Sequence, residues 1–246
     1  MIKRQKGEQR PVENTFPAAE PQTVVERTYE QIKSLAISFE LRPGDRLNEG
    51  QLSAQLGISR TPLREALNRL AADGFLTLSP GRGFFRRPLD PKEIFDLYEL
   101  RLQIETAGAR LAIDRASAAQ LEGLAHFLEA SSADRPERSI ADLVDLDEAF
   151  HRRLMALSGN AEMLRVLDNV HGRIRFVRWI HMEGRRSHTQ AEHKAILHAL
   201  RNGHADHCVD LLRGHIGRRL EQVVEAVKEG YLRIYMPSNG AAPGGS

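Results

Sequence analysis

The pattern of apolar and polar positions divides the chain into two regions of different character. Residues 22–88 mix helical and strand periods: a helix that stops at LRPGD, two helices separated by a turn at Gly57, and two short strands, FLTL and FFRRPL, joined by the turn SPGRG. Residues 89–233 show helical spacing almost throughout, and the helices are expected at 91–115, 118–131, 138–158, 160–182, 188–202 and 204–229. The sequence therefore predicts a mainly α protein whose second region is an all-α bundle of six or seven helices.

The two ends of the chain lack such a pattern. Residues 1–21 are polar and rich in proline, which predicts a disordered arm. The last residues, PSNGAAPGGS, are typical of a flexible tail. With a linker near Pro88–Pro91, the expected organisation is an arm at 1–21, one domain at 22–88, a second domain at 89–233 and a tail at 234–246.

Composition excludes several classes of protein. The chain has 246 residues, of which 41% are hydrophobic and 28% charged, so it is not expected to be disordered, collagen-like or a disulfide-rich miniprotein. Its single cysteine, Cys208, cannot form an internal disulfide, which fits a reducing cytoplasm. No apolar run reaches the roughly 18 residues that a membrane-spanning helix needs. We therefore expect a cytoplasmic protein with no membrane partner.

The net charge is only +2, which by itself argues against a nucleic-acid-binding protein. The charge is unevenly distributed, however. From Arg42 to Arg87 the chain has 8 basic and 4 acidic residues, and every basic one is arginine. The planar guanidinium group suits phosphate oxygens and guanine edges, although a solvated surface would explain so small an excess equally well.

The order of elements in residues 22–88 is that of a winged helix-turn-helix, whose second helix enters the major groove of DNA. The start of that helix carries Ser59, Arg60, Thr61 and Arg64. Hydroxyl groups at a helix N-terminus suit phosphate oxygens, and either arginine can bind guanine from the face that they share. Arg82, at the hairpin tip between two glycines, can reach the minor groove. A helix pair used only for packing is the alternative.

A family resemblance rests on the run LRPGDRLNEGQLSAQLGISRTPLREALNRLAADGFLTLSPGRGFF. It resembles the N-terminal domain of the GntR family of transcriptional regulators, and SRTPLREAL is close to the most distinctive segment of that family. The resemblance implies that the positions at or near the operator are Arg42, Ser59, Arg60, Thr61, Arg64 and Gly83. Gly50 stands where one branch of the family often has an arginine, which puts one phosphate contact in doubt.

Four residues of the second region are candidate metal ligands. Asp147 and His151 lie four residues apart in VDLDEAFHRRLM, so they share one helical face at a spacing that suits one ion. His193 in AEHKAILHAL and His215 in LLRGHIGRRL each border an apolar stripe and are expected to point into the bundle. Histidines in such places are usually core residues, so spacing alone leaves both interpretations open.

The helical region resembles the ligand-binding domain, called FCD, of the FadR branch of the GntR family. In its metal-containing members an aspartate and a histidine four residues apart join two later histidines, and Asp147, His151, His193 and His215 match that pattern in order. The resemblance implies a divalent ion, commonly zinc or nickel, with open positions for a carboxylate or water.

Two arginines are candidate effector ligands. Arg101 falls near the apolar side of its predicted helix, and family members often use an arginine in this context to bind an anionic effector. A salt bridge from Arg101 to Glu105 is the alternative. Arg175, on the helix expected at 160–182, is a lower-ranked candidate.

Together these features predict a homodimeric regulator, a repressor rather than an enzyme, that binds a palindromic DNA operator and a small organic acid. One alternative is a metal-dependent hydrolase with a DNA-binding appendage. Against it, Glu148 and Glu192 adjoin predicted ligands in sequence but point about 100° away around their helices, and no HExxH motif is present. The other alternative is a constitutive DNA-binding protein with a structural metal.

Overall fold

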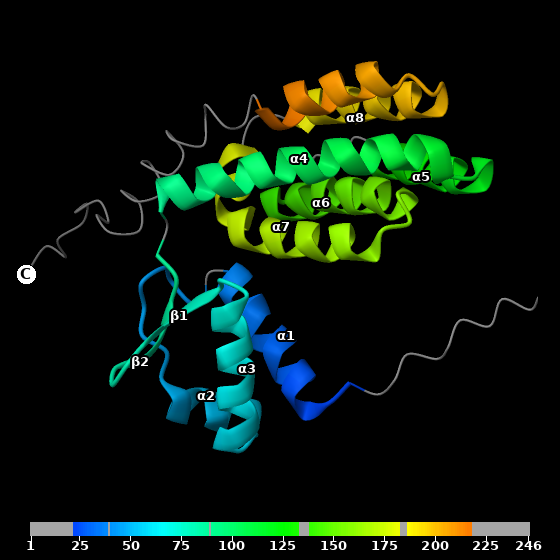
Figure 1. The fold of residues 1–246 in the computed structure, drawn as a ribbon. Coiled ribbons are helices and arrows are strands. Elements are labelled where there is room, and N and C mark those ends of the chain that lie inside the picture. Colours follow the sequence, from blue (N-terminus) through cyan, green and yellow to red (C-terminus); the bar gives the residue numbers. More distant parts are fainter. Residues whose placement is uncertain (1–21, 39, 89, 133–137, 183–185, 218–246) are drawn as a thin grey trace, which may run out of the picture.

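The computed structural model describes residues 22–38, 40–88, 90–132, 138–182 and 186–217 (Figure 1). The predicted arm, the predicted tail and the part of the last predicted helix beyond residue 217 lie outside these residues. Within them the buried apolar side chains form two separate clusters, one from residues 29–84 and the other from residues 94–216. Each of the two regions therefore has a hydrophobic core of its own.

Three helices make up most of the first region: α1 (Val24–Ile37), α2 (Glu49–Leu56) and α3 (Arg60–Ala72). α1 begins at a capping box in which the side chains of Thr23 and Glu26 each accept a hydrogen bond from the other's backbone N–H. α2 ends at Gly57, whose φ of +63° is the left-handed conformation that favours glycine. The apolar face of α3 is buried at helical spacing by Leu63, Ala66, Leu67 and Leu70.

The predicted hairpin is present and forms the wing. Its strands are β1 (Leu76–Ser79) and β2 (Gly83–Arg86). They pair antiparallel, with Leu76 opposite Arg86 and Ser79 opposite Gly83. Arg46 forms an isolated β-bridge with Phe85, so the segment before α2 lies along the outer side of β2. The first region is thus a winged helix-turn-helix.

The second region consists of helices as predicted: α4 (Pro91–Arg115), α5 (Ala118–Ser132), α6 (Ile140–Leu157), α7 (Ala161–Met182), α8 (Arg186–Arg201) and a further helix over residues 205–217. α4 packs against α6, α7 and α8, while α5 packs against α6 and α8 (Figure 1). The mainly α fold expected from the sequence is confirmed.

α7 also contacts the first region. The side-chain amide of Asn169 donates a hydrogen bond to the Asp73 carbonyl oxygen at 2.9 Å. Gly172 lies so close to the Phe75 ring that a Cβ at this position would be 2.9 Å from two ring carbons. α7 therefore packs against the end of α3 and the start of the wing, where only a residue without a side chain fits.

Candidate metal centre and DNA-binding surface

Four buried side chains from three helices bring their donor atoms together. They are Asp147 and His151 on α6, His193 on α8 and His215 on the helix over residues 205–217, and all four ligand atoms lie within 4.8 Å of one another. The Asp147 Oδ1 atom is 3.1 Å from His193 Nε2, and His215 Nε2 is 3.1 Å from His151 Nε2 and 3.4 Å from His193 Nε2. The four residues that the sequence singled out thus lie at one place.

This geometry fits a divalent ion. Nitrogen and oxygen ligands bind zinc at roughly 2.0–2.2 Å, so neighbouring donors around one ion lie about 3.0–3.5 Å apart. Most of the separations fall in or near this range, including the 3.8 Å from Asp147 Oδ1 to His151 Nε2 and to His215 Nε2. Three imidazoles and one carboxylate are also a donor set that first-row metals accept.

The sequence of α6 explains how its two ligands reach the core. A capping box between Ser139 and Asp142 starts the helix, and Asp147 and His151 follow on one face beside the buried Phe150. The Phe150 ring stacks on His193 with the ring centres 3.9 Å apart. This aromatic contact orients the imidazole from α8 toward the ligands from α6.

Two glutamates hold the histidines from behind. Glu105 on α4 is 2.5 Å from His151 Nδ1, and Glu192 on α8 is 2.7 Å from His215 Nδ1. A carboxylate that accepts a hydrogen bond from Nδ1–H keeps the proton on that nitrogen, so Nε2 carries the lone pair that a metal binds. Sequence reasoning named Glu105 only as a partner for Arg101. The sequence interpretation also set Glu192 aside, because it points about 100° away from His193 around their helix. That direction brings Glu192 to His215, which lies on another helix.

The protonation states of His151 and Glu105 also favour metal binding. Burial lowers the pKa of His151 well below its usual value of 6.5, and the charge of Arg101 acts in the same direction. Burial, the largest single effect, would raise the pKa of Glu105, but Arg101 and His171 together outweigh it and hold the pKa below its usual value. The site therefore combines a neutral imidazole with an ionised carboxylate behind it, which is the state that binds a metal.

Arg101 lies fully buried next to this cluster. Its Nε is 2.5 Å from Glu105 Oε1, so the salt bridge named as the alternative is present. Its two terminal nitrogens, Nη1 and Nη2, have no hydrogen-bond partner in the described part of the chain. Buried guanidinium nitrogens without partners are costly and are expected to face a ligand or water. The salt bridge and a ligand-binding role are therefore compatible.

A second buried arginine, Arg178 on α7, was not predicted. It is fully buried and forms ion pairs with Asp147 and with Glu148, the latter at 3.0 Å. It thus neutralises the carboxylate that would bind the metal. Its position three residues after Arg175 places it on the same helix as the candidate that the sequence did name, but the sequence pattern offered no signal that separated the two.

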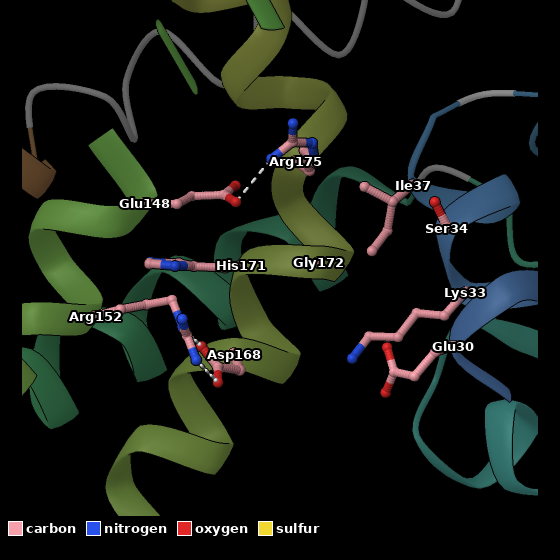
Figure 2. A pocket seen from close by; sticks show the side chains of 10 residues that line it. All are labelled: Glu30, Lys33, Ser34, Ile37, Glu148, Arg152, Asp168, His171, Gly172 and Arg175. Carbon is pink, nitrogen blue, oxygen red and sulfur yellow. Dashed lines mark hydrogen bonds and ion pairs between the residues drawn. The ribbon is translucent and has the colours of Figure 1, made fainter. Parts of the chain in front are cut away.

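Arg175 lines a cavity that is separate from the metal-ligand cluster. It binds Glu148 at 2.7 Å and Asp145 at 2.5 Å, and it lines a cavity of about 400 Å³ between α1 and α6–α7 (Figure 2). In the same view His171 extends from α7 between the side chains of Glu148 and Arg152. His171 Nε2 is 3.8 Å from Glu105, so this residue lies between the cavity and the metal-ligand cluster.

The residues predicted to contact DNA lie on the exposed side of the winged helix-turn-helix. Ser59 occupies the N-cap position of α3 without making a side-chain cap hydrogen bond. Arg60, Thr61 and Arg64 follow in the first turn and are exposed, and Arg64 forms an ion pair with Glu49 at 3.1 Å. The rest of the predicted set is Arg42, exposed ahead of α2, together with Arg82 and Gly83 on the wing.

No helix in the described ranges is both long enough and apolar enough to cross a membrane.

Comparisons with known proteins agree with this architecture. The family model "Bacterial regulatory proteins, gntR family" matches residues 24–85, and the model "FCD domain" matches residues 96–218. The Nta operon transcriptional regulator of Aminobacter aminovorans is 43% identical over 202 residues, which cover 82% of this chain and 95% of that protein. The uncharacterized HTH-type transcriptional regulator YdhC of Bacillus subtilis is 28% identical over 205 residues, covering 82% of this chain and 92% of that protein.

Among solved structures, E. coli McbR/YncC has a similar fold, with a TM-score of 0.70 at 20% identity over 86% of this chain and 100% of that chain. The winged helix-turn-helix, the helical bundle behind it and these relatives lead to one conclusion: the chain belongs to the GntR family of bacterial regulatory proteins, with an FCD domain of FadR-like architecture, and is a DNA-binding transcriptional regulator.

Proposed function

We propose that this regulator is a repressor that responds to a small organic acid bound in its FCD domain, next to a divalent metal ion. The observation that carries the proposal is the fully buried Arg101, whose two terminal nitrogens have no partner among the described residues while Glu105 fixes its Nε. Glu105 links Arg101 to the candidate metal ligands, because the same carboxylate also contacts His151. A carboxylate is the group that matches such an arginine beside a metal.

The metal would be held by Asp147, His151, His193 and His215, and zinc or nickel suits this donor set. When bound, such an ion supplies Lewis acidity, which here would attract a carboxylate oxygen. Glu105 and Glu192 would keep the protons of two ligands on Nδ1, so that Nε2 can bind the ion, and Arg178 offsets part of the charge of Asp147.

Metal content tests this assignment directly. His193→Ala and His215→Ala should each lower the bound metal measured by elemental analysis of the purified protein. His126→Ala is the matched control, since His126 is exposed on α5, and its metal content should equal that of wild type. Wild-type metal content in both ligand variants would show that the ion, if any, lies elsewhere.

The response to an effector needs a path to the DNA-binding domain, and α7 offers one. Arg178 on α7 pairs with the metal ligand Asp147, and His171 lies beside Glu105. One and two residues from His171 along the same helix, Gly172 and Asn169 contact the start of the wing and the end of α3. A ligand that displaces Arg178 would therefore shift a helix on which the DNA-binding domain rests, provided that it binds the two arrangements with different affinity.

A thermal-shift screen of the metal-loaded protein against small carboxylates and sugar acids tests the proposal. A true effector binds the native state and therefore raises the thermal midpoint of wild type. It should leave the thermal midpoint of Arg101→Ala unchanged. The same acid should then weaken binding to operator DNA in a gel-shift titration. If no acid that raises the midpoint alters operator binding, the metal is structural and DNA binding constitutive.

The hydrolase alternative has less support. Glu148, the carboxylate next to Asp147 in sequence, is engaged by Arg175 and Arg178, and Glu105 and Glu192 are engaged by imidazoles. No acidic residue that the structure describes near the ligands is thus left as a general base. Turnover of model esters that disappears in His193→Ala would favour the hydrolase.

We also propose that the protein acts as a homodimer on a palindromic operator, because a single recognition helix reads only one half-site. Sedimentation of the protein with a selected operator duplex should give two chains per duplex.

A further inference from the structure

Three arginines from two different segments line one hollow beside the start of α3. The hollow has a volume of about 620 Å³, and its walls include Arg46, Glu49, Gly50, Arg60, Arg64 and Gly83. Arg60 and Arg64 belong to α3 and were already candidates for DNA contacts. Arg46 precedes α2 and has no role assigned so far.

Arg46 is held on a firm support. Its backbone bridges Phe85, and the flanking residues add two hydrogen bonds of 2.8 Å, from Leu47 N–H to the Phe84 carbonyl and from Arg86 N–H to the Asp45 carbonyl. Its guanidinium lies beside the end of β2 that adjoins the wing's turn, since a Cβ on Gly83 would be 3.9 Å from Arg46 Nε and 4.0 Å from Nη2. The side chain therefore projects from a segment whose backbone is hydrogen-bonded to β2.

The charge of the hollow is positive. Its single carboxylate, Glu49, pairs with Arg64 at 3.1 Å. Neither Arg46 nor Arg60 forms an ion pair with any residue that the structure describes. Two guanidinium groups without acidic partners thus face a space whose walls also include two glycines, Gly50 and Gly83.

We infer that this hollow receives a phosphate group of the DNA backbone and that Arg46 is a phosphate-binding residue. The inference rests on the proposal that the exposed start of α3 faces DNA. Arg46 stands between the start of α3 and the wing, so it is placed to contact the strand that borders the groove rather than the base edges within it. Arginine binds phosphate oxygens through two parallel N–H groups, and such contacts position a protein on the duplex without reading its sequence.

The test measures how DNA affinity depends on salt. A duplex is first selected from a random pool with wild-type protein, and its affinity is then measured by fluorescence anisotropy at several salt concentrations. Each lost phosphate contact reduces the slope of log affinity against log salt by about 0.9 and weakens binding about fivefold near 0.15 M salt. Arg46→Ala should show this loss on the selected duplex and, equally, on a random duplex.

Two controls make the result specific. Arg213→Ala removes the same charge from an exposed position in the helix over residues 205–217 and should leave the slope unchanged. Gly50→Arg, added to Arg46→Ala, should restore the slope, because a Cβ on Gly50 meets only Asn48 Oδ1, at 3.4 Å, and the residue lines the same hollow. Gly50→Gln in the same background should restore nothing.

The outcomes separate this inference from the proposed DNA-binding surface. If Arg60→Ala weakens binding while Arg46→Ala keeps the wild-type slope and affinity, the α3 surface stands and the role of Arg46 is wrong. Suppose that Arg46→Ala binds DNA weakly, and that adding Gly50→Arg restores neither the affinity nor the salt slope although the thermal midpoint of the double variant is unchanged. The loss of affinity then does not come from a phosphate contact in this hollow. If both Arg46→Ala and Arg60→Ala bind as wild type does, the proposed surface itself is wrong.

Discussion

Glu105 is the residue on which most of the proposed sensor chemistry converges. Its two carboxylate oxygens lie 2.5 Å from Arg101 Nε and 2.5 Å from His151 Nδ1, and His171 lies 3.8 Å away. All of these side chains are buried, so the contacts are little screened by solvent. The same carboxylate therefore orients a proposed metal ligand and the arginine that would hold the effector.

Glu105→Gln should lower metal affinity by about 10–100-fold, because a neutral amide is a weaker acceptor for the His151 Nδ1–H group. It should also weaken the thermal shift produced by an effector, since Arg101 loses its ion pair. Competition with a chromogenic zinc chelator measures the first effect. Glu99→Gln, on the exposed side of the same helix, is the control and should bind metal as wild type does.

At the scale of elements, periodicity predicted most of this protein. The helices expected at 91–115 and 160–182 are observed at Pro91–Arg115 and Ala161–Met182, because their apolar stripes are long and continuous. The i, i+4 pair on α6 likewise placed two ligands on one face. The partners behind them could not be predicted, because Glu105, Glu192 and Arg178 reach the site across helices, and such contacts depend on how the helices pack rather than on spacing within one of them.

Packing of α7 against the wing leads to a prediction for Gly172. Gly172→Ala places a methyl group 2.9 Å from the Phe75 ring, so the contact must open, at a cost of about 1–3 kcal/mol. Metal content should stay at the wild-type level, whereas the difference in operator affinity between zinc-loaded and chelator-treated protein should shrink. Gly123→Ala on α5 is the matched control, because a Cβ there meets nothing within 4 Å. An unchanged zinc effect on operator affinity in Gly172→Ala would exclude α7 as the connecting helix.

For the whole molecule, the buried apolar side chains form two separate cores, one in each domain. The core of the FCD domain differs from an ordinary one because it encloses ionisable groups: Arg101, Glu105, Asp147, His151, His171 and Arg178. Each must be paired or neutral to stay buried, and the histidines meet that requirement by remaining neutral.

This arrangement predicts how stability depends on pH. Burial lowers the pKa of both His151 and His171 well below 6.5, whereas the unfolded chain titrates near that value. Below pH 6.5 the unfolded state therefore binds more protons than the folded state, so the free energy of unfolding falls as pH drops and is fully retained above pH 6.5. Each histidine contributes up to about 1.4 kcal/mol for every pH unit below this value.

Thermal melts of chelator-treated protein at pH 8.0, 6.5 and 5.5 check this dependence. Wild type should lose stability mainly between the last two values, and His171→Gln should lose less over the same interval. Equal losses in wild type and variant would show that His171 does not titrate on unfolding as its burial requires.

The small contact between α7 and the wing also bears on how new sensors could be built. α7 meets the end of α3 and the start of the wing through Asn169 and Gly172 and also packs against α1, so a helical domain taken from a relative must reproduce these contacts. It must present a side-chain donor for the Asp73 carbonyl and a residue without a Cβ opposite Phe75. In a chimera that satisfies these two conditions, the new ligand should change affinity for the old operator. A chimera with a bulkier residue opposite Phe75 should bind the ligand and the operator, but the ligand should not change operator affinity.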